Sequence, residues 1–321
     1  MPRLDYSGSC PSLLLEPQRS NNIASSEYFQ SGWTFVGATK TDNYGISPEG
    51  VKNSTRIQFA GANNYMNLPS GSVGGFETCT IYMKGTSGET IKFGKGSNVA
   101  QSDYHTLTGD WQRLEFIGED RGTAYHISTY GGATARDIEI YGAQLEQGSY
   151  PTSYIPTYGT SVTRSSDNSS LTGFDYFPNG EGTVMIEFEI DEVSISGYPE
   201  LFRINNPSDA TDFVFCYLFE PSAGDVKIGY RLDVDNDKKI EASRSIALGT
   251  NKMVVRIQRG DCTAYLNGVE IPPSQTYNGV ADANMTSLRI NAQSFIANER
   301  IKQFVTFPTP LTDSECIALT S

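Results

Sequence analysis

The sequence is poor in the residues from which most catalytic and metal sites are built. Its 321 residues include two histidines, His105 and His126, and five cysteines, no two of which lie at Cys-x-x-Cys or other metal-ligand spacing. Glycine motifs that bind phosphates or dinucleotides are missing as well. The alternating pattern around His126 predicts a surface position on a strand. These absences exclude a histidine–cysteine metal cluster and give no support to nucleophilic catalysis.

Long apolar runs are also missing. No run approaches the ~18 residues that a membrane span needs, and the start MPRLDYSGS lacks the apolar core of a signal peptide. We therefore expect a protein made in the cytosol and not inserted in a membrane. Cys79, Cys216 and Cys262 are expected as buried thiols, with one disulfide as an open alternative. The net charge of −13 and the lack of a basic patch argue against nucleic acid as a partner.

Helical periodicity is almost absent, and alternation of apolar and polar residues takes its place. Period-two patterns indicate strands that cover a core on one side. They are punctuated by glycine-containing turns, and they occur at 33–41, 55–61, 76–85, 89–96, 111–119, 123–130, 135–146, 182–191, 200–205, 212–220, 226–235, 238–246, 251–260, 262–271, 287–292 and 300–308. The sequence predicts an all-β fold of two antiparallel β-sandwich (jelly-roll) domains, with one short C-terminal helix that starts at the capping box Thr312/Glu315.

The length favours two domains, because a single core seldom grows beyond ~250–300 residues. The predicted division is an N-terminal segment, 1–22, that packs on the sandwiches, a first jelly roll, 23–149, a connector, 150–167, and a second sandwich, 168–321.

The connector combines prolines with aromatic residues. Pro151 and Pro156 forbid a helix and interrupt ladder pairing, whereas a free linker would be rich in Gly and Ser. We therefore expect an extended connector at a fixed inter-domain angle, with four side chains packed against both domains: Tyr150, Tyr154, Ile155 and Tyr158.

Four segments carry a resemblance to a known family: CPSLLLEPQRSNN, GDWQRLEF, IYGAQLEQGSYPTSYIPTYGTSVTRSSD and IKQFVTFPTPLTDSECIALTS. Together they resemble a recurrent cassette of tailed-bacteriophage virion proteins, found in tail-fibre, tail-tip and head-fibre proteins. The resemblance spans nearly the whole chain. It implies a carbohydrate-binding-module-like jelly roll followed by a concanavalin-A/laminin-G-like sandwich. The cassette usually follows a virion-anchoring region, whereas Met1 stands just before it here, so either such a region has been removed or the anchoring surface lies within the two domains.

The resemblance implies a virion protein that is synthesised in the host cytoplasm and assembles with other virion proteins as a homo-oligomer, with a trimer favoured. The leading hypothesis is an adhesin that binds a host surface glycan and is not an enzyme. An alternative is a purely architectural decoration protein with a symmetric interface larger than ~2,000 Å².

A third hypothesis is a polysaccharide depolymerase. Glu187, Glu189 and Asp191 alternate on one strand, and retaining glycosidases need two neighbouring carboxyl groups. The order is E-x-E-x-D rather than E-x-D-x-E, and no Trp lies beside it. A solvated strand face is therefore the expected outcome.

Aromatic residues at strand ends and in loops are the candidates for sugar contact. In the first domain they are Trp33, Tyr44, Tyr65, Tyr104 and Tyr130, and Tyr198, Tyr217 and Tyr277 are possible contributors in the second.

No cofactor is expected, with calcium as the one open alternative. The candidate ligands are Asp233, Asp235 and Asp237 in LDVDNDKK. Lys238 and Arg244 stand where an EF-hand needs Gly and Glu, so only a looser calcium site at the rim of the sandwich remains.

Overall fold

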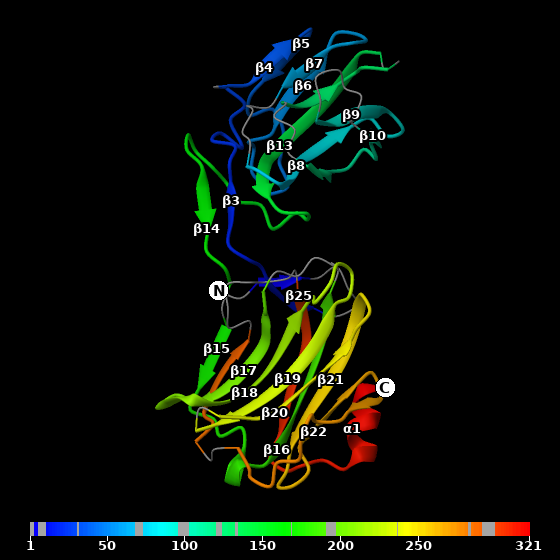
Figure 1. Ribbon diagram of the computed structural model, residues 1–321. Helices are drawn as coiled ribbons and strands as arrows, with labels where there is room; N and C mark the ends of the chain where they lie inside the picture. Colours follow the sequence, from blue (N-terminus) through cyan, green and yellow to red (C-terminus); the bar gives the residue numbers. More distant parts are fainter. Residues whose placement is uncertain are drawn as a thin grey trace. The chain divides into compact units, whose positions relative to one another are not determined.

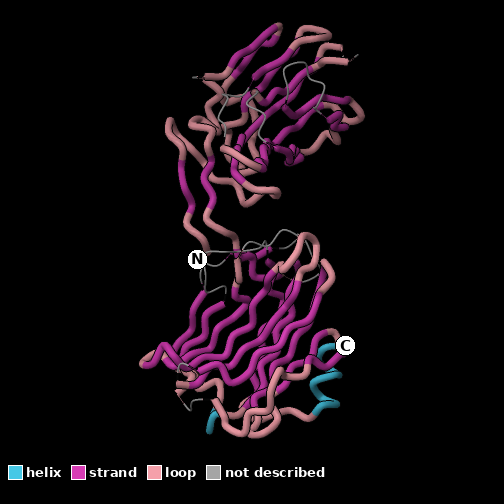
Figure 2. The backbone as a smooth tube through the Cα atoms, in the orientation of Figure 1, coloured by secondary structure: helices cyan, strands magenta, loops and turns pink. Residues whose placement is uncertain are grey.

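The computed structural model describes residues 3–5, 11–30, 32–67, 73–95, 103–119, 124–131, 134–167, 169–190, 197–235, 237–281, 284–290 and 299–321. Within this part of the chain every strand pairing is antiparallel, and helical structure is limited to η1 (Pro178–Gly180) and α1 (Asp313–Thr320) (Figures 1 and 2). The prediction of two antiparallel sandwiches with one short C-terminal helix is confirmed. No helix in the described residues is long and apolar enough to cross a membrane.

The chain forms two compact units whose boundaries cut across the sequence. The first sandwich comprises residues 19–165, and the second comprises residues 1–18 together with 166–321. The N-terminal strand around Leu15 pairs with the strand 299–307, and Leu15 is 1% exposed in the second core. The first sandwich is therefore an insertion in the second. The segment 1–22, treated as one piece in the sequence analysis, divides after residue 18.

The first sandwich has two five-stranded sheets. One has the order β10-β9-β12-β7-β4, with the bounds β10 (Asp103–Thr106), β9 (Thr90–Lys95), β12 (Tyr125–Ser128), β7 (Tyr65–Asn67) and β4 (Thr34–Val36). The other has the order β11-β8-β13-β6-β5, with the bounds β11 (Gln112–Glu119), β8 (Phe76–Gly85), β13 (Arg136–Gln147), β6 (Thr55–Phe59) and β5 (Ala38–Thr41). A two-stranded ribbon joins β3 (Arg19–Asn21) to β14 (Val162–Arg164).

Both sheets of the first sandwich contribute to one apolar core. Ile81 and Ile140 come from one sheet, and Phe93, Ile127 and Met66 from the other, all of them 0% exposed. Each is flanked by residues that point to the opposite face, as the period-two pattern predicts. The core thus leaves one outward face on each sheet.

The second sandwich has a seven-stranded and a six-stranded sheet. The first has the order β1-β2-β25-β16-β21-β22-β23, with the bounds β1 (Arg3–Asp5), β2 (Ser12–Leu15), β25 (Glu299–Phe307), β16 (Gly182–Ile190), β21 (Gly249–Ile257), β22 (Thr263–Leu266) and β23 (Val269–Ile271). The second has the order β15-β24-β17-β18-β19-β20, with the bounds β15 (Ser169–Thr172), β24 (Ser287–Ile290), β17 (Glu200–Asn206), β18 (Asp209–Phe219), β19 (Lys227–Val234) and β20 (Asp237–Ser245).

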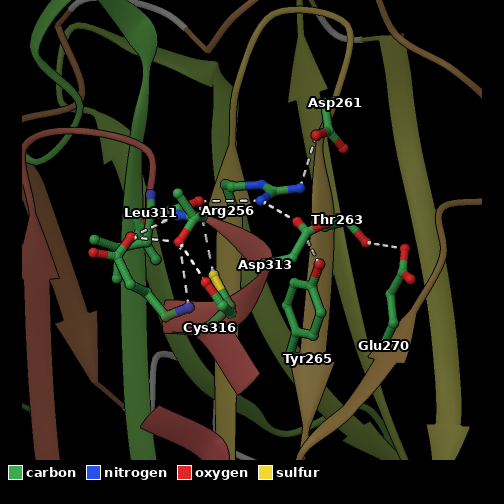
Figure 3. Close-up of polar contacts among 12 residues, drawn as sticks. Arg256, Asp261, Thr263, Tyr265, Glu270, Leu311, Asp313 and Cys316 are labelled. Carbon is green, nitrogen blue, oxygen red and sulfur yellow. Dashed lines mark hydrogen bonds and ion pairs between the residues drawn. The ribbon is translucent and has the colours of Figure 1, made fainter. Parts of the chain in front are cut away.

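Helix α1 packs on the outer face of the seven-stranded sheet. Cys316 of α1 lies in a small apolar cluster with Met185, Val254 and Tyr265, separate from the main core. The capping box between Thr312 and Glu315 is present, as predicted. Polar contacts below the helix start are shown in Figure 3.

The connector is anchored within the first sandwich. Ile155 is 4% exposed, and its carbonyl accepts a hydrogen bond from Asn21 Nδ2 at 2.8 Å. The hydroxyl of Tyr154 donates to Glu27 Oε1 at 3.3 Å, and that of Tyr158 does so at 3.1 Å. Tyr158 is nevertheless 66% exposed, so the expectation that its ring is packed is wrong. Its hydroxyl and its backbone, which bridges to Ser25, are engaged, whereas the ring lies at the surface 6.3 Å from that of Tyr28.

Candidate functional site

A row of side chains crosses the first sheet of the first sandwich. Tyr104 on β10 pairs with Lys92 on β9, Lys92 with Ser128 on β12, Ser128 with Tyr65 on β7, and Tyr65 with Val36 on β4. Directly paired residues lie on the same side of a sheet. The next residues along β9, β12 and β7 are in the core, so this row lies on the outward face.

Three tyrosines and one lysine gather at one end of this face. Tyr65 and Tyr130 stack with ring centroids 6.0 Å apart and planes 30° apart. The Tyr104 hydroxyl donates to the carbonyl of Tyr130 at 3.2 Å and to that of Gly131 at 2.9 Å. Lys92 Nζ lies 4.7 Å from the centroid of the Tyr104 ring, and Tyr104 is 51% exposed. We call Tyr65, Tyr104, Tyr130 and Lys92 the tyrosine face.

The position of Tyr104 depends on the turn that follows β12. Gly131 has a φ of 82°, a left-handed conformation that favours glycine. A Cβ at Gly131 would also clash with the Tyr104 hydroxyl oxygen. The close approach of Tyr104 to the turn therefore requires glycine on two grounds.

Two buried polar atoms lie on the same outward side. His126 is 4% exposed and Ser128 is 0% exposed, and within the described residues neither His126 Nε2 nor Ser128 Oγ has a hydrogen-bond partner. Burial, with a smaller contribution from the charge of Lys92, lowers the pKa of His126 to about 4. Sequence analysis placed His126 on the surface, which is wrong, because β12 is a central strand that its neighbours cover on both sides.

The other two first-domain candidates lie elsewhere. Trp33 is 7% exposed, and its ring meets Phe29 edge-on at 4.8 Å inside the core. The prediction that Trp33 contacts a ligand is therefore wrong, because its ring packs in the core. Tyr44 is exposed and lies under the Arg56 guanidinium at 4.7 Å, next to the other sheet. The structure thus brings together three of the five predicted aromatic residues.

The second-domain candidates separate in a similar way. The rings of Tyr198 and Tyr217 are in contact, with centroids 6.0 Å apart, whereas the Tyr277 hydroxyl donates to the carbonyl of Val280 at 3.3 Å. Sequence alternation had not identified Lys92 or Ser128 as members of a site, because strand register across a sheet cannot be read from one strand at a time.

The candidate catalytic carboxylates are on the outer face of β16. Glu187 and Glu189 are both half-buried, and Glu189 forms an ion pair with Lys302 Nζ at 2.9 Å. Asp191 lies outside the described residues.

The three candidate calcium ligands lie in the β19–β20 hairpin and take different partners. Asp233 is 3% exposed and pairs with Arg231, and Asp237 pairs with Lys239. Asp235 occupies a turn position with a φ of 54°. No group of three or more His, Cys, Asp or Glu side chains that could hold a metal ion occurs within the described part of the chain.

No protein-family model matches the chain, and a search of curated proteins finds no significant match. Among solved structures, the CBM40 of Ruminococcus gnavus IT-sialidase bound to α2,3-sialyllactose is 17% identical, with a TM-score of 0.35, and the match covers 48% of this chain and 94% of that one. Mouse laminin α1 domains LG4–5 are 11% identical, with a TM-score of 0.29 and coverage of 87% and 94%. The GH43 protein BlXynB of Bacillus licheniformis is 8% identical, with a TM-score of 0.32 and coverage of 89% and 56%. At these values the similarities identify neither a family nor a ligand for this chain.

Proposed function

We propose that this protein is a non-enzymatic adhesin of a tailed-phage virion that binds a host surface glycan on the tyrosine face. The observation that carries the proposal is the convergence of three tyrosine rings, of which Tyr104 is exposed and Tyr65 and Tyr130 are half-buried, above buried polar atoms without partners. The tyrosine face brings aromatic rings next to Lys92 Nζ, and His126 Nε2 and Ser128 Oγ lie on the same side of the sheet.

The chemistry of a pyranose fits this arrangement. One face of the sugar ring presents C–H groups, which pack on the flat, electron-rich face of an aromatic ring. Its hydroxyl edge needs hydrogen-bond donors and acceptors. Lys92 supplies a charged donor at the surface. Ser128 Oγ and neutral His126 Nε2 are buried beneath the tyrosine face, so a saccharide hydroxyl reaches them only when the overlying side chains move.

The virion context rests on the resemblance of the four quoted segments. It supports other virion proteins as partners and a homo-oligomer, with a trimer favoured, located on the phage particle. A mass measurement of the purified protein by light scattering tests the oligomeric state, and a monomer at all concentrations would contradict this part of the proposal.

The glycan-binding proposal is tested with the full chain on a glycan panel that includes α2,3-sialyllactose and on host cells. Tyr104→Ala and Tyr65→Ala are expected to lower binding at least ~10-fold each, since one well-placed aromatic contact contributes about 1.4 kcal/mol. Tyr44→Ala is the matched control, because Tyr44 is similarly exposed but lies by the other sheet. Equal binding by all three variants would overturn the proposal.

The absence of catalysis is also part of the proposal. The ion pair between Glu189 and Lys302 supports a structural role for that carboxylate. Incubation of the protein with host polysaccharide should release no reducing ends. Release that disappears in Glu187→Gln would establish the depolymerase hypothesis instead.

A further inference from the structure

The second sandwich carries a continuous series of aromatic rings on the outer face of its six-stranded sheet. Side chains along β18 alternate between the buried core and this face, and the series continues at a residue just before β17. Neighbouring ring centroids lie between 5.0 and 5.9 Å apart. We call this series the aromatic ladder, which consists of Tyr198, Phe219, Tyr217, Phe215 and Phe213.

The ladder is a preformed platform. From Phe215 to Tyr198, consecutive ring planes differ by 30°, 31° and 29°, so the rings turn gradually along the strand. Tyr217 lies directly over Gly229, where an added Cβ would be 2.5 Å from its ring. Its hydroxyl donates to Glu241 Oε1 at 3.1 Å. The ring positions are therefore set by the sheet before any ligand arrives, which reduces the entropy lost on binding.

Arginines flank the ladder on both neighbouring strands. The Arg203 guanidinium carbon lies 4.1 Å from the Phe213 ring centroid, and that of Arg231 lies 5.9 Å from it. Arg203 Nε donates to Glu200 Oε2 at 2.9 Å, and Arg231 Nε donates to Asp233 Oδ1 at 2.6 Å. Each carboxylate fixes the plane of its arginine's guanidinium beside the rings. The remaining N–H groups of that guanidinium point elsewhere.

A third arginine extends the same row. Arg289 on β24 pairs with Arg203, Arg203 pairs with Phe215, and Phe215 pairs with Arg231. The side chain of Arg289 is exposed and takes part in no hydrogen bond or ion pair within the described residues. In a chain of net charge −13, one sheet face thus presents three guanidinium groups in line with an aromatic platform.

We propose that the aromatic ladder and Arg289 form a second saccharide site, one that takes an acidic polysaccharide. The site is separate from the tyrosine face, but the choice of a saccharide rests on the proposed function. Pyranose rings would lie along the ladder, and a uronate or other carboxylate would meet Arg289. A guanidinium matches a carboxylate with two parallel hydrogen bonds.

The charge row favours a polyanion over a second copy of this chain. In a two-fold pairing of the face with itself, the same surface patch meets its own copy. That pairing would leave the charge of Arg289 without an acidic partner in the row, because Glu200 and Asp233 are already held by Arg203 and Arg231. In the ladder Tyr198 is exposed, three phenylalanines are half-buried and Tyr217 is buried between them. With its rim of arginines, this surface suits an extended ligand that carries regularly spaced negative charge.

The full chain is tested by affinity electrophoresis in gels that contain polygalacturonate, alginate or hyaluronan, with dextran as the neutral comparison. We expect retardation in at least one acidic gel and none in dextran. Tyr198→Ala with Phe219→Ala should weaken it at least ~10-fold. Arg289→Gln, an exposed change that leaves the core untouched, should weaken it ~3–10-fold and reduce its dependence on salt. Unchanged melting temperatures verify the fold of each variant.

The matched control is the pair Tyr104→Ala and Tyr65→Ala on the first sandwich. Loss of retardation in the ladder variant with retention in this control supports the second site. The reverse pattern overturns the second site and leaves the tyrosine-face proposal standing. No retardation by any acidic polysaccharide also overturns the second site, while the glycan panel still tests the first. Two other results would identify a different occupant and overturn the second saccharide site as well. One is tight binding of single-stranded oligo-dT by the ladder, and the other is a dimer that dissociates when the ladder is substituted.

Discussion

Arg256 connects α1 to the sheet beneath it, and its removal should release the helix (Figure 3). Its side chain is 4% exposed. It donates to the carbonyl of Leu311 at 3.1 Å, to Asp313 Oδ1 at 2.6 Å and to Asp261 Oδ2 at 2.8 Å. Tyr265 adds a hydrogen bond to Asp313 Oδ1 at 2.8 Å. The start of α1 is thus held by one guanidinium and one hydroxyl.

The magnitude follows from these contacts. A hydrogen bond from a charged donor to a carbonyl contributes about 1.5–3 kcal/mol. The two carboxylates are 59% and 69% exposed as side chains, so each ion pair adds only about 0.2–1 kcal/mol. Arg256→Met keeps the apolar stem and relieves the burial of a charge, so we expect a net loss of about 2–3 kcal/mol. Asp261→Asn, the matched control, removes one exposed pair and should cost less than about 1 kcal/mol.

Hydrogen exchange of the α1 amides is the appropriate assay, because it reports opening of the helix separately from unfolding of either sandwich. In Arg256→Met, the amides of α1 should exchange ~30–150-fold faster, the equivalent of about 2–3 kcal/mol. Hydrogen bonds from Arg256 and then Tyr265 lower the pKa of Asp313 below its ordinary 3.8. Helix docking in the wild type should therefore weaken as the pH falls below about 3.8, and the variant should lose most of this dependence. An exchange rate within ~2-fold of wild type would refute the reasoning.

Three further predictions concern the two cores. Leu15→Ala should destabilise the second sandwich by about 2–4 kcal/mol without changing the first, because Leu15 is buried in the second core. Calorimetry should show one unfolding transition shifted to a lower temperature and the other unmoved. Equal shifts of both transitions would contradict the division of the chain. Burial holds the pKa of His126 at about 4, so the stability of the first sandwich should fall as the pH drops from about 6.5 towards 4. In urea titrations, His126→Asn should reduce this dependence of the unfolding free energy on pH. An unchanged dependence on pH would contradict the prediction. Glu77 and Lys95 form an ion pair with side chains 0% and 3% exposed. Glu77→Gln should lower the free energy of unfolding in urea by about 3–5 kcal/mol, because it leaves a buried charge unpaired. A loss below about 1 kcal/mol would show that the ion pair does not stabilise the first sandwich.

Strand positions were readable from the sequence where apolar residues alternate. The strand expected at 76–85 is β8 (Phe76–Gly85), and those expected at 182–191 and 251–260 are β16 (Gly182–Ile190) and β21 (Gly249–Ile257). Short edge strands such as β10 (Asp103–Thr106) and β15 (Ser169–Thr172) were not identified. Their four residues carry too little apolar surface to create a pattern.

The candidate site was readable only in part. Exposed loop aromatics were a reasonable first guess, and Tyr65, Tyr104 and Tyr130 do converge. Trp33 has the same kind of sequence context, yet its ring packs against Phe29 in the core. Local sequence reports which residues are aromatic, but burial depends on which strand from elsewhere in the chain covers them.

By itself the sequence determined the kind of secondary structure, the two-layer architecture and the helix cap, because these depend on residue spacing within one segment. The tertiary structure decided which strands are neighbours. That placed residues 1–18 in the second sandwich, lined up Tyr104, Lys92 and Tyr65 across four adjacent strands, and aligned Arg289 with Arg203 beside Phe215. Pairing between distant strands is set by the packing of the whole core and by register, and neither leaves a mark in any single strand.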